Sequence, residues 1–252
     1  MKEAFTYMFK DNMFKKKAFM YFVFALIAGF IVQCANTYLP STPKTVPPIQ
    51  YYLLWLLGTF AMFIPQGYNL NCIRAIMEQR ENPILPFMNI KNSFIIGFKF
   101  YLSLFIFMLG IVAASIVYCI IIGILSSLHL QILSILMCLF LILFLLVFLL
   151  VFIIYIPAFC CTFAKTELLT IFFRFVRVTK LIKQDIVNYF KYVGLYAVFF
   201  IGIFIISILI SIPFQGNIIG AFIIAFLTSL IGAYTSFVAA YLTARAVKPE
   251  FI

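Results

Sequence analysis

From Leu139 to Ile154 the chain carries no polar side chain, and this run lies inside a longer hydrophobic segment from Ile132 to Phe159. An apolar helix of ~20 residues is enough to cross the hydrocarbon core of a bilayer. No water pairs with backbone polar groups there, so an isolated spanning segment must be a helix. Of the 252 residues, 66% are hydrophobic and only 10% are charged, whereas a soluble domain carries about 25% charged residues. The sequence therefore predicts an all-α integral membrane protein.

Six apolar segments are long enough to be transmembrane helices. We expect spans at about 18–36, 51–71, 96–125, 132–160, 192–212 and 218–244. They form a single transmembrane domain over residues 1–252, because too little chain remains for a separate soluble domain. Pro65 and Pro157 lie inside the second and fourth segments, where a proline predicts a kink.

The basic residues fall on one side of these spans. Lys44 is the only Lys or Arg in an expected outer loop, so the other seventeen of the eighteen lie on the opposite side, together with all seven carboxylates. Loops rich in Lys and Arg stay in the cytoplasm. The sequence thus predicts a multi-pass protein of the cell (cytoplasmic) membrane whose N- and C-termini are cytoplasmic.

Three cytoplasmic segments are expected to be interfacial amphipathic helices, at about 3–15, 84–94 and 167–190. The third has the clearest 3.6-residue period, and its Phe172 and Phe173 are expected to enter the acyl boundary. Its basic membrane-surface face consists of Arg174, Arg177, Lys180, Lys183 and Lys191. The expected partner is a bilayer with anionic headgroups, which explains the net charge of +11 better than nucleic acid does.

The layout of an inner helix, an outward span and a return span occurs three times, with units beginning near residues 3, 84 and 168. One interpretation is a set of three pseudo-repeated units, each an inner amphipathic helix plus a helical hairpin. Transporters often place a binding site where such repeats meet. The other interpretation is that alternating charges and spans look periodic in any six-span protein.

Polar residues gather on the inner half of the second span. They are Gln66, Tyr68, Asn69, Asn71 and Arg74. One hypothesis is a ligand-binding cleft, formed where the two prolines bend their helices, with Arg74 meeting a phosphate. The alternative is that these side chains lie at the level of the headgroups and need no ligand.

Residues that support catalysis or bind metals are scarce. His129 is the sole histidine and lies in a short outer turn, and the six cysteines form no CxxC pair. Structural zinc needs four clustered ligands, and no phosphate-binding loop or HExxH motif is present. We expect no enzyme activity, no cofactor and no metal site. The spans also lack ionisable residues at mid-depth, which disfavours ion-coupled transport.

Several short motifs are spread along the chain. They are Pro65-Gln66-Gly67-Tyr68, Ile73-Arg74, Asn82 to Pro86, Gly97-Phe98-Lys99 and Ile156-Pro157-Ala158. With the basic surface helix, this pattern resembles an uncharacterised prokaryotic membrane family, domain of unknown function 4013. The resemblance covers most of the chain, implies a multi-pass fold and supplies no activity.

Two functions fit these observations. The leading prediction is a non-enzymatic membrane protein that binds or moves lipid or another amphipathic molecule. The alternative is a structural or accessory subunit of an export or signalling complex, held by another membrane protein or by a second copy of this chain. Glycines in the last two spans, such as Gly194, Gly202 and Gly232, would permit close helix approach, either to a partner or in internal packing.

Overall fold

The computed structural model describes residues 14–36, 47–79, 90–128, 130–211 and 218–247. Within these ranges all regular structure is helical. The helices are α2 (Phe14–Asn36), α3 (Ile49–Met77), α4 (Ile90–Ser127), α5 (Gln131–Thr166), η2 (Ile171–Phe173), α6 (Phe175–Gln184), α7 (Ile186–Ser211) and α8 (Ile218–Ala246). Of these described helices, α2, α4, α5, α7 and α8 are long and apolar enough to cross a membrane. The chain is an all-helical membrane protein.

Each expected span coincides with one long helix. Helix α4 begins before the expected span 96–125 and α5 ends after the expected span 132–160, and both extensions carry polar residues, such as Lys91 and Lys165. Helix α3 continues past the expected end at residue 71, and Pro65 lies within it. Helix α3 is long enough, but its residues are not apolar enough for it to count among these candidate spans. A sixth span therefore stays a prediction.

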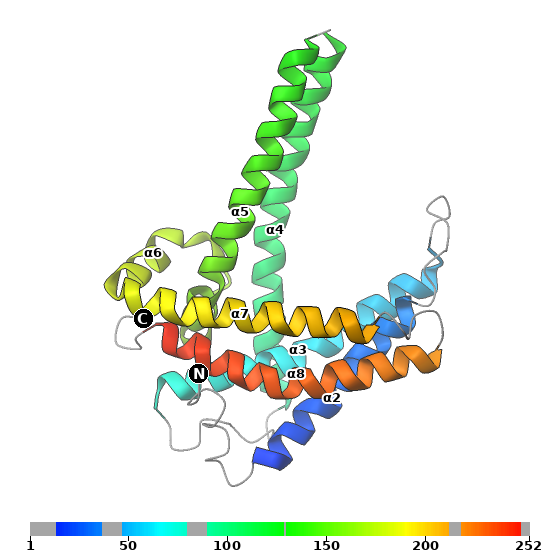
Figure 1. Ribbon diagram of the computed structural model, residues 1–252, viewed down its shortest axis with the longest axis vertical. Helices are drawn as coiled ribbons and strands as arrows, with labels where there is room; N and C mark the ends of the chain where they lie inside the picture. The colour runs from blue at the N-terminus through cyan, green and yellow to red at the C-terminus, as the bar shows by residue number, and fades with distance from the viewer. Residues whose placement is uncertain (1–13, 37–46, 80–89, 129, 212–217, 248–252) are drawn as a thin grey trace.

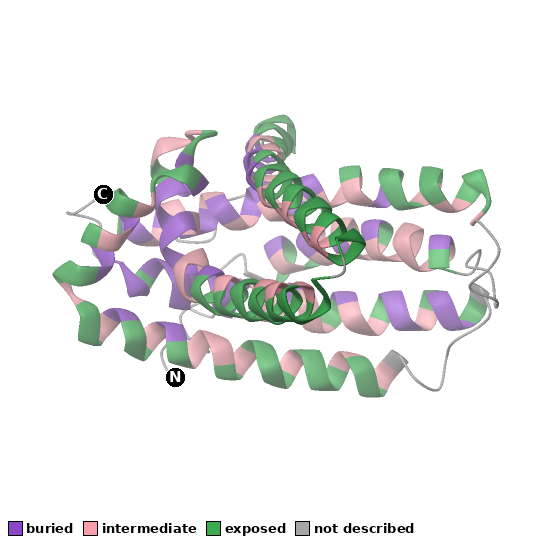
Figure 2. Cartoon of the chain, turned by 90° about the horizontal axis from the view of Figure 1, so that it is seen from above, coloured by how far each residue is buried: buried purple, intermediate pink, exposed green. Residues whose placement is uncertain are grey.

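The long helices are arranged in two groups. The helices α2, α3, α7 and α8 lie in one layer, in which α2 packs against α3 and α8, and α8 packs against α7. The α4–α5 hairpin projects steeply away from this layer, as the two views agree (Figures 1 and 2). The structure therefore does not align all six expected spans along one direction, and the threefold repeat also stays a prediction.

The core lies where one end of each of the helices α3, α4 and α5 meets α8. Buried residues occupy the second half of α3, the start of α4, the end of α5 and most of α8, whereas the outer parts of α4 and α5 are exposed on nearly all sides (Figure 2). Phe172 lies at the centre of an aromatic cluster with ring centroids 5.0 Å from Phe159 and 5.7 Å from Phe100. The remaining apolar surface must be covered by lipid, because its exposure to water would be unfavourable.

Two expectations for the amphipathic segments are wrong. The segment 167–190 is not one helix, because Glu167 ends α5, Asp185 ends α6, and residues from Ile186 onwards belong to α7. Phe172 does not reach the acyl boundary, because it is only 1% exposed and packs inside the core. Of the expected helix 84–94, the part from Ile90 belongs to α4. The rest of that helix and residues 3–13 lie outside the described residues.

Candidate functional site

A cavity of about 350 Å³ lies among the helices of the core. It is bounded by residues from α2, α3, α4, α5, η2, α7 and α8. They are Tyr21, Gln66, Asn69, Ile73, Phe100, Leu104, Phe152, Ile156, Cys160, Phe172, Tyr196, Phe200, Ile203, Thr235, Ser236, Ala239 and Thr243. Its volume falls within the ~300–1,000 Å³ that is usual for small-molecule sites.

The wall of this cavity is divided between a polar and an apolar side. Six of the polar side chains come from α2, α3 and α8, and they are Tyr21, Gln66, Asn69, Thr235, Ser236 and Thr243; Tyr196 on α7 and the thiol of Cys160 on α5 are the others. The helices α4, α5 and α7 contribute chiefly aromatic and aliphatic side chains, such as Phe100, Phe152 and Ile203. Because hydrogen-bonding groups and hydrocarbon border the same space, the cavity is complementary to an amphipathic molecule.

The polar side is partly organised by internal hydrogen bonds. The hydroxyl oxygens of Tyr21 and Ser236 lie 2.8 Å apart and join α2 to α8. Thr235 Oγ1 donates to the carbonyl oxygen of Gly232 at 3.2 Å. Asn69 Oδ1 is buried, and among the described residues no donor reaches it. A buried acceptor without a partner is costly, so Asn69 is the polar residue of this wall whose hydrogen bonding is incomplete among the described residues.

The five residues of the expected cleft separate into two sets. Gln66 and Asn69 line the cavity, whereas Tyr68, Asn71 and Arg74 do not. Tyr68 is 2% exposed and packs its ring against those of Tyr21 and Phe237, at 6.1 and 6.3 Å. Ligand binding by any of the five stays a prediction. The position of Arg74, however, differs from the phosphate-facing one that the sequence suggested.

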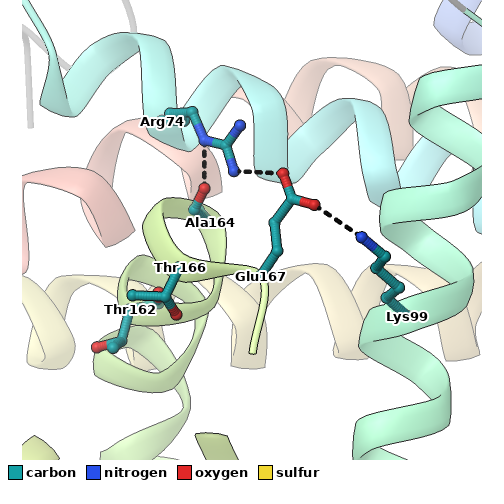
Figure 3. Close-up of polar contacts among 6 residues, drawn as sticks. All are labelled: Arg74, Lys99, Thr162, Ala164, Thr166 and Glu167. Carbon is teal, nitrogen blue, oxygen red and sulfur yellow. Dashed lines mark hydrogen bonds and ion pairs between the residues drawn. The ribbon is translucent and has the colours of Figure 1, made fainter. Parts of the chain in front are cut away.

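Arg74 instead holds the end of α5 (Figure 3). Its Nε donates to the carbonyl oxygen of Ala164, one of the last four carbonyls of α5, which have no helical partner. Its Nη2 lies 2.8 Å from Glu167 Oε1, and Lys99 Nζ lies 3.1 Å from Glu167 Oε2. The carboxylate of Glu167 therefore links α3 and α4 to the residue that ends α5.

Glu167 has an unusual backbone conformation for this role. Its φ of 51° is left-handed, a conformation that usually belongs to glycine at a helix end. The hydrogen bond from Arg74, with a second one from Lys99, lowers the pKa of this carboxyl below its ordinary value of 4.5 and outweighs the opposing effect of burial. The carboxylate is thus ionised near neutral pH and its two contacts are charge-assisted.

The cations of the expected basic face are all exposed. Arg174 precedes α6, Arg177, Lys180 and Lys183 lie on it, and Lys191 lies in the first part of α7, while Val178, Leu181 and Ile182 turn into the core. Helix α6 is held to α5 by a hydrogen bond between the hydroxyls of Tyr155 and Thr179 at 2.9 Å. The position of α6 against the core therefore fixes which way its cations face.

A second cavity, of about 400 Å³, lies between α4 and α5 and is lined mainly by apolar groups, among them Phe107, Ala114 and Phe144. It lacks the polar side of the first cavity. Among the described residues, no group of three or more His, Cys, Asp or Glu side chains could hold a metal ion. The polar-sided cavity is therefore the better candidate for a binding site.

Several residues of the site were not predicted from the sequence. Tyr21, Thr235 and Ser236 lie in apolar segments and look like ordinary residues of a span. Glu167 carried one usable signal, because it is the only carboxylate between Glu81 and Asp185. No periodicity links these positions, since helices that are distant in the chain bring them together.

Comparison with known proteins gives the family of the chain. The family described as "Protein of unknown function (DUF4013)" matches residues 51–213. That segment includes α3, which supplies Gln66, Asn69 and Arg74, and Glu167 with its partner Lys99. No curated protein and no solved structure matches the chain. The match covers well over half of the sequence, and the chain belongs to the DUF4013 family.

Proposed function

We propose that this protein is a non-enzymatic component of the cell membrane that binds or moves an amphipathic molecule, such as a lipid, through the polar-sided cavity. The observation that carries the proposal is the division of the cavity wall. Gln66 and Asn69 present amide groups on one side, and Phe152 and Ile156 present hydrocarbon on the other. A lipid needs both surfaces, whereas a polar metabolite needs only the first.

The proposed topology has six spans with both termini in the cytoplasm. Helix α3 is the sixth span, because its 29 residues extend for ~44 Å, which exceeds the ~30 Å of a hydrocarbon core. Its low hydropathy has a physical cause: Gln66 and Asn69 face the interior cavity rather than lipid. Polar side chains in a membrane span are expected to face inward in this way.

The proposed surface partner is a layer of anionic headgroups on the cytoplasmic side. The exposed cations of α6 and the start of α7 supply the attraction, at ~1 kcal/mol for each cation near the membrane surface. Helix α6 would then be an amphipathic interfacial helix, with its apolar face docked on the protein core and its basic face on the headgroups.

The experiment that tests the cavity fills it with a side chain. Ala239 lines the cavity, and Ala239→Leu adds three carbons to that space. Native mass spectrometry of the purified protein should detect a retained lipid in the wild type and at least a fivefold lower occupancy in Ala239→Leu. The matched control is Ala114→Leu, which fills the second cavity instead and should retain the lipid. Equal occupancy in all three proteins would refute the proposed site.

A second candidate function is that of an accessory subunit. It is favoured by the outer part of the α4–α5 hairpin, where Val117, Ile120 and Leu143 are 58%, 57% and 60% exposed. Large exposed apolar surfaces often bind a partner. A photo-crosslinker at Ile120 should join a single protein chain if the hairpin binds a partner, and only lipid if it faces the bilayer. A product of twice the mass of the chain would identify a second copy.

A further inference from the structure

The polar-sided cavity reaches the surface of the molecule on α7. This helix contributes Tyr196, Phe200 and Ile203 to the cavity wall. Among the described wall residues Phe200 alone is exposed, at 46%, and the others are buried or half-buried. A side chain that borders a cavity and also lies at the surface stands at an opening between the two. The mouth of the cavity is therefore beside Phe200.

Helix α5 of the hairpin borders the same cavity. Its contributions include Phe152 and Ile156, yet α7 packs chiefly against α8 and hardly touches α5. The two helices thus share the cavity with little direct packing between them. Except for the Tyr196 hydroxyl and the Cys160 thiol, the side chains that they contribute to the wall are pure hydrocarbon. The region between α5 and α7 is therefore an apolar edge of the site.

The mouth lies at a depth where a bilayer consists of hydrocarbon. Lys191 is the only charged residue of α7, and in the proposed topology it marks the level of the cytoplasmic headgroups. Phe200 lies ~14 Å further along the helix at 1.5 Å for each residue, which is about half of a ~30 Å hydrocarbon core. A ligand dissolved in water would have to cross lipid to reach this mouth. A ligand dissolved in the membrane is already beside it.

Hydrogen bonds between helices close the cytoplasmic side of the cavity. Tyr189 is 1% exposed, and its hydroxyl donates to the carbonyl oxygen of Ile154, which joins the start of α7 to α5. The thiol of Cys161 donates to the carbonyl oxygen of Thr243 at 3.0 Å and joins α5 to α8. Thr243 is itself a buried residue of the cavity wall. These contacts favour a path that leads sideways into the bilayer over one that leads to the cytoplasm.

The size of the cavity gives a second reason for a lateral opening. Its volume of about 350 Å³ lies near the lower end of the ~300–1,000 Å³ that is usual for sites of drug-sized molecules. A head group and a whole long acyl chain do not fit together in that volume, so part of the chain must lie outside. The mouth at Phe200 lets the chain extend into hydrocarbon, where it avoids contact with water.

Resting on the proposed function, we infer that the ligand is a long-chain amphiphile of the membrane that enters the cavity sideways, between α5 and α7. Its head lies in the cavity, and its tail extends past Phe200 and Ile203 into the bilayer. The cavity therefore takes its ligand from the membrane and not from water.

The test follows the exchange of retained lipid in the full chain. The protein, purified with host lipid, is placed in vesicles made from the lipid of the same host grown in deuterated medium. Native mass spectrometry then records how fast heavy lipid replaces light lipid. Ile203→Trp narrows the mouth and should slow the exchange about tenfold, whereas Phe200→Ala widens it and should speed the exchange by a similar factor. The matched controls, Ile201→Trp and Phe190→Ala, change exposed residues of α7 outside the cavity wall and should exchange like the wild type.

A further variant distinguishes the two ends of the cavity. Tyr189→Phe removes only the hydroxyl that joins α7 to α5, and it should exchange like the wild type. Faster exchange in Tyr189→Phe, with wild-type rates in Ile203→Trp and Phe200→Ala, would place the entrance at the cytoplasmic end and overturn the inference. Wild-type rates in all of these variants, or equal changes in the two controls, would overturn it as well. A wild-type protein that retains no lipid would instead overturn the proposed function itself.

Discussion

At the residue scale, Glu167 connects three helices through its side chain and backbone. It accepts hydrogen bonds from Arg74 and Lys99, and it ends α5 in a left-handed conformation that costs an ordinary residue ~1–2 kcal/mol. Replacing Glu167 with Gln should lower the free energy of unfolding by about 1–2 kcal/mol, because the charge-assisted contacts are lost. Unfolding in mixed dodecylmaltoside–dodecyl sulfate micelles measures this difference. A double-mutant cycle with Arg74→Gln is the control, and strictly additive effects would show that the two residues are not coupled.

The same carboxylate predicts a dependence of stability on pH. Its pKa in the folded protein is lowered from 4.5, chiefly by the hydrogen bond from Arg74. A carboxyl whose pKa is lowered by folding contributes fully above its unfolded pKa, and the contribution is lost as the pH falls through the folded value. The gap in apparent Tm between wild type and Glu167→Gln should thus be constant from pH 7 to about 5 and shrink below 4.5. A gap that did not shrink at any pH below 4.5 would contradict this assignment.

At the element scale, two glycines determine how closely α3 and α4 approach. A Cβ on Gly67 would lie 1.7 Å from the carbonyl oxygen of Ser93, and one on Gly97 would lie 1.9 Å from that of Phe63. Both distances are far shorter than any real contact, and backbone atoms cannot turn aside. Gly67→Ala and Gly97→Ala should each lower the free energy of unfolding by at least about 2–3 kcal/mol, by forcing the helices apart.

Matched glycines on α4 provide the control for this prediction. Gly110 and Gly123 have nothing within 4 Å of a Cβ, so Gly110→Ala and Gly123→Ala should leave the stability unchanged or raise it by up to ~1 kcal/mol through helix propensity. Detergent-induced unfolding of the four variants distinguishes the two pairs. Similar losses at all four positions would mean that helix approach is not the cause.

Reasoning from sequence identified the helices well and their contacts poorly. Apolar length marked every long helix, because the bilayer imposes length and hydropathy directly. It pointed to close packing at Gly194, Gly202 and Gly232, yet nothing lies within 4 Å of a Cβ at these three positions. The break at Asp185 was missed because a cap acts locally: its Oδ1 accepts a hydrogen bond from the backbone of Asn188 at 3.3 Å and begins α7. Hydropathy carries no information on such contacts.

The sequence predicted some residues of the candidate site but not the contacts of others. Gln66 and Asn69 stood out as amides within an apolar helix, and both line the cavity. Arg74 stood out equally but pairs with Glu167, which lies 93 residues further along the chain. Sequence shows that a polar group is present inside a span. It does not show whether that group meets a ligand or another part of the protein.

At the scale of the whole molecule, the crossing of the membrane by α3 determines the orientation of every later helix, so orientation tests it. If α3 spans, the turn between α4 and α5 faces outward and α6 faces the cytoplasm, in agreement with its three cations, Arg177, Lys180 and Lys183. If α3 does not span, both positions are reversed and the basic helix is outside. The prediction uses a cysteine-free background with a single cysteine at Leu128, which is 62% exposed in that turn, or at Lys183 on α6. A membrane-impermeant maleimide added to intact cells should label Leu128→Cys directly and Lys183→Cys only after permeabilisation. The opposite pattern would exclude α3 as a span. It would also place the basic face on the side of the membrane away from the anionic cytoplasmic leaflet.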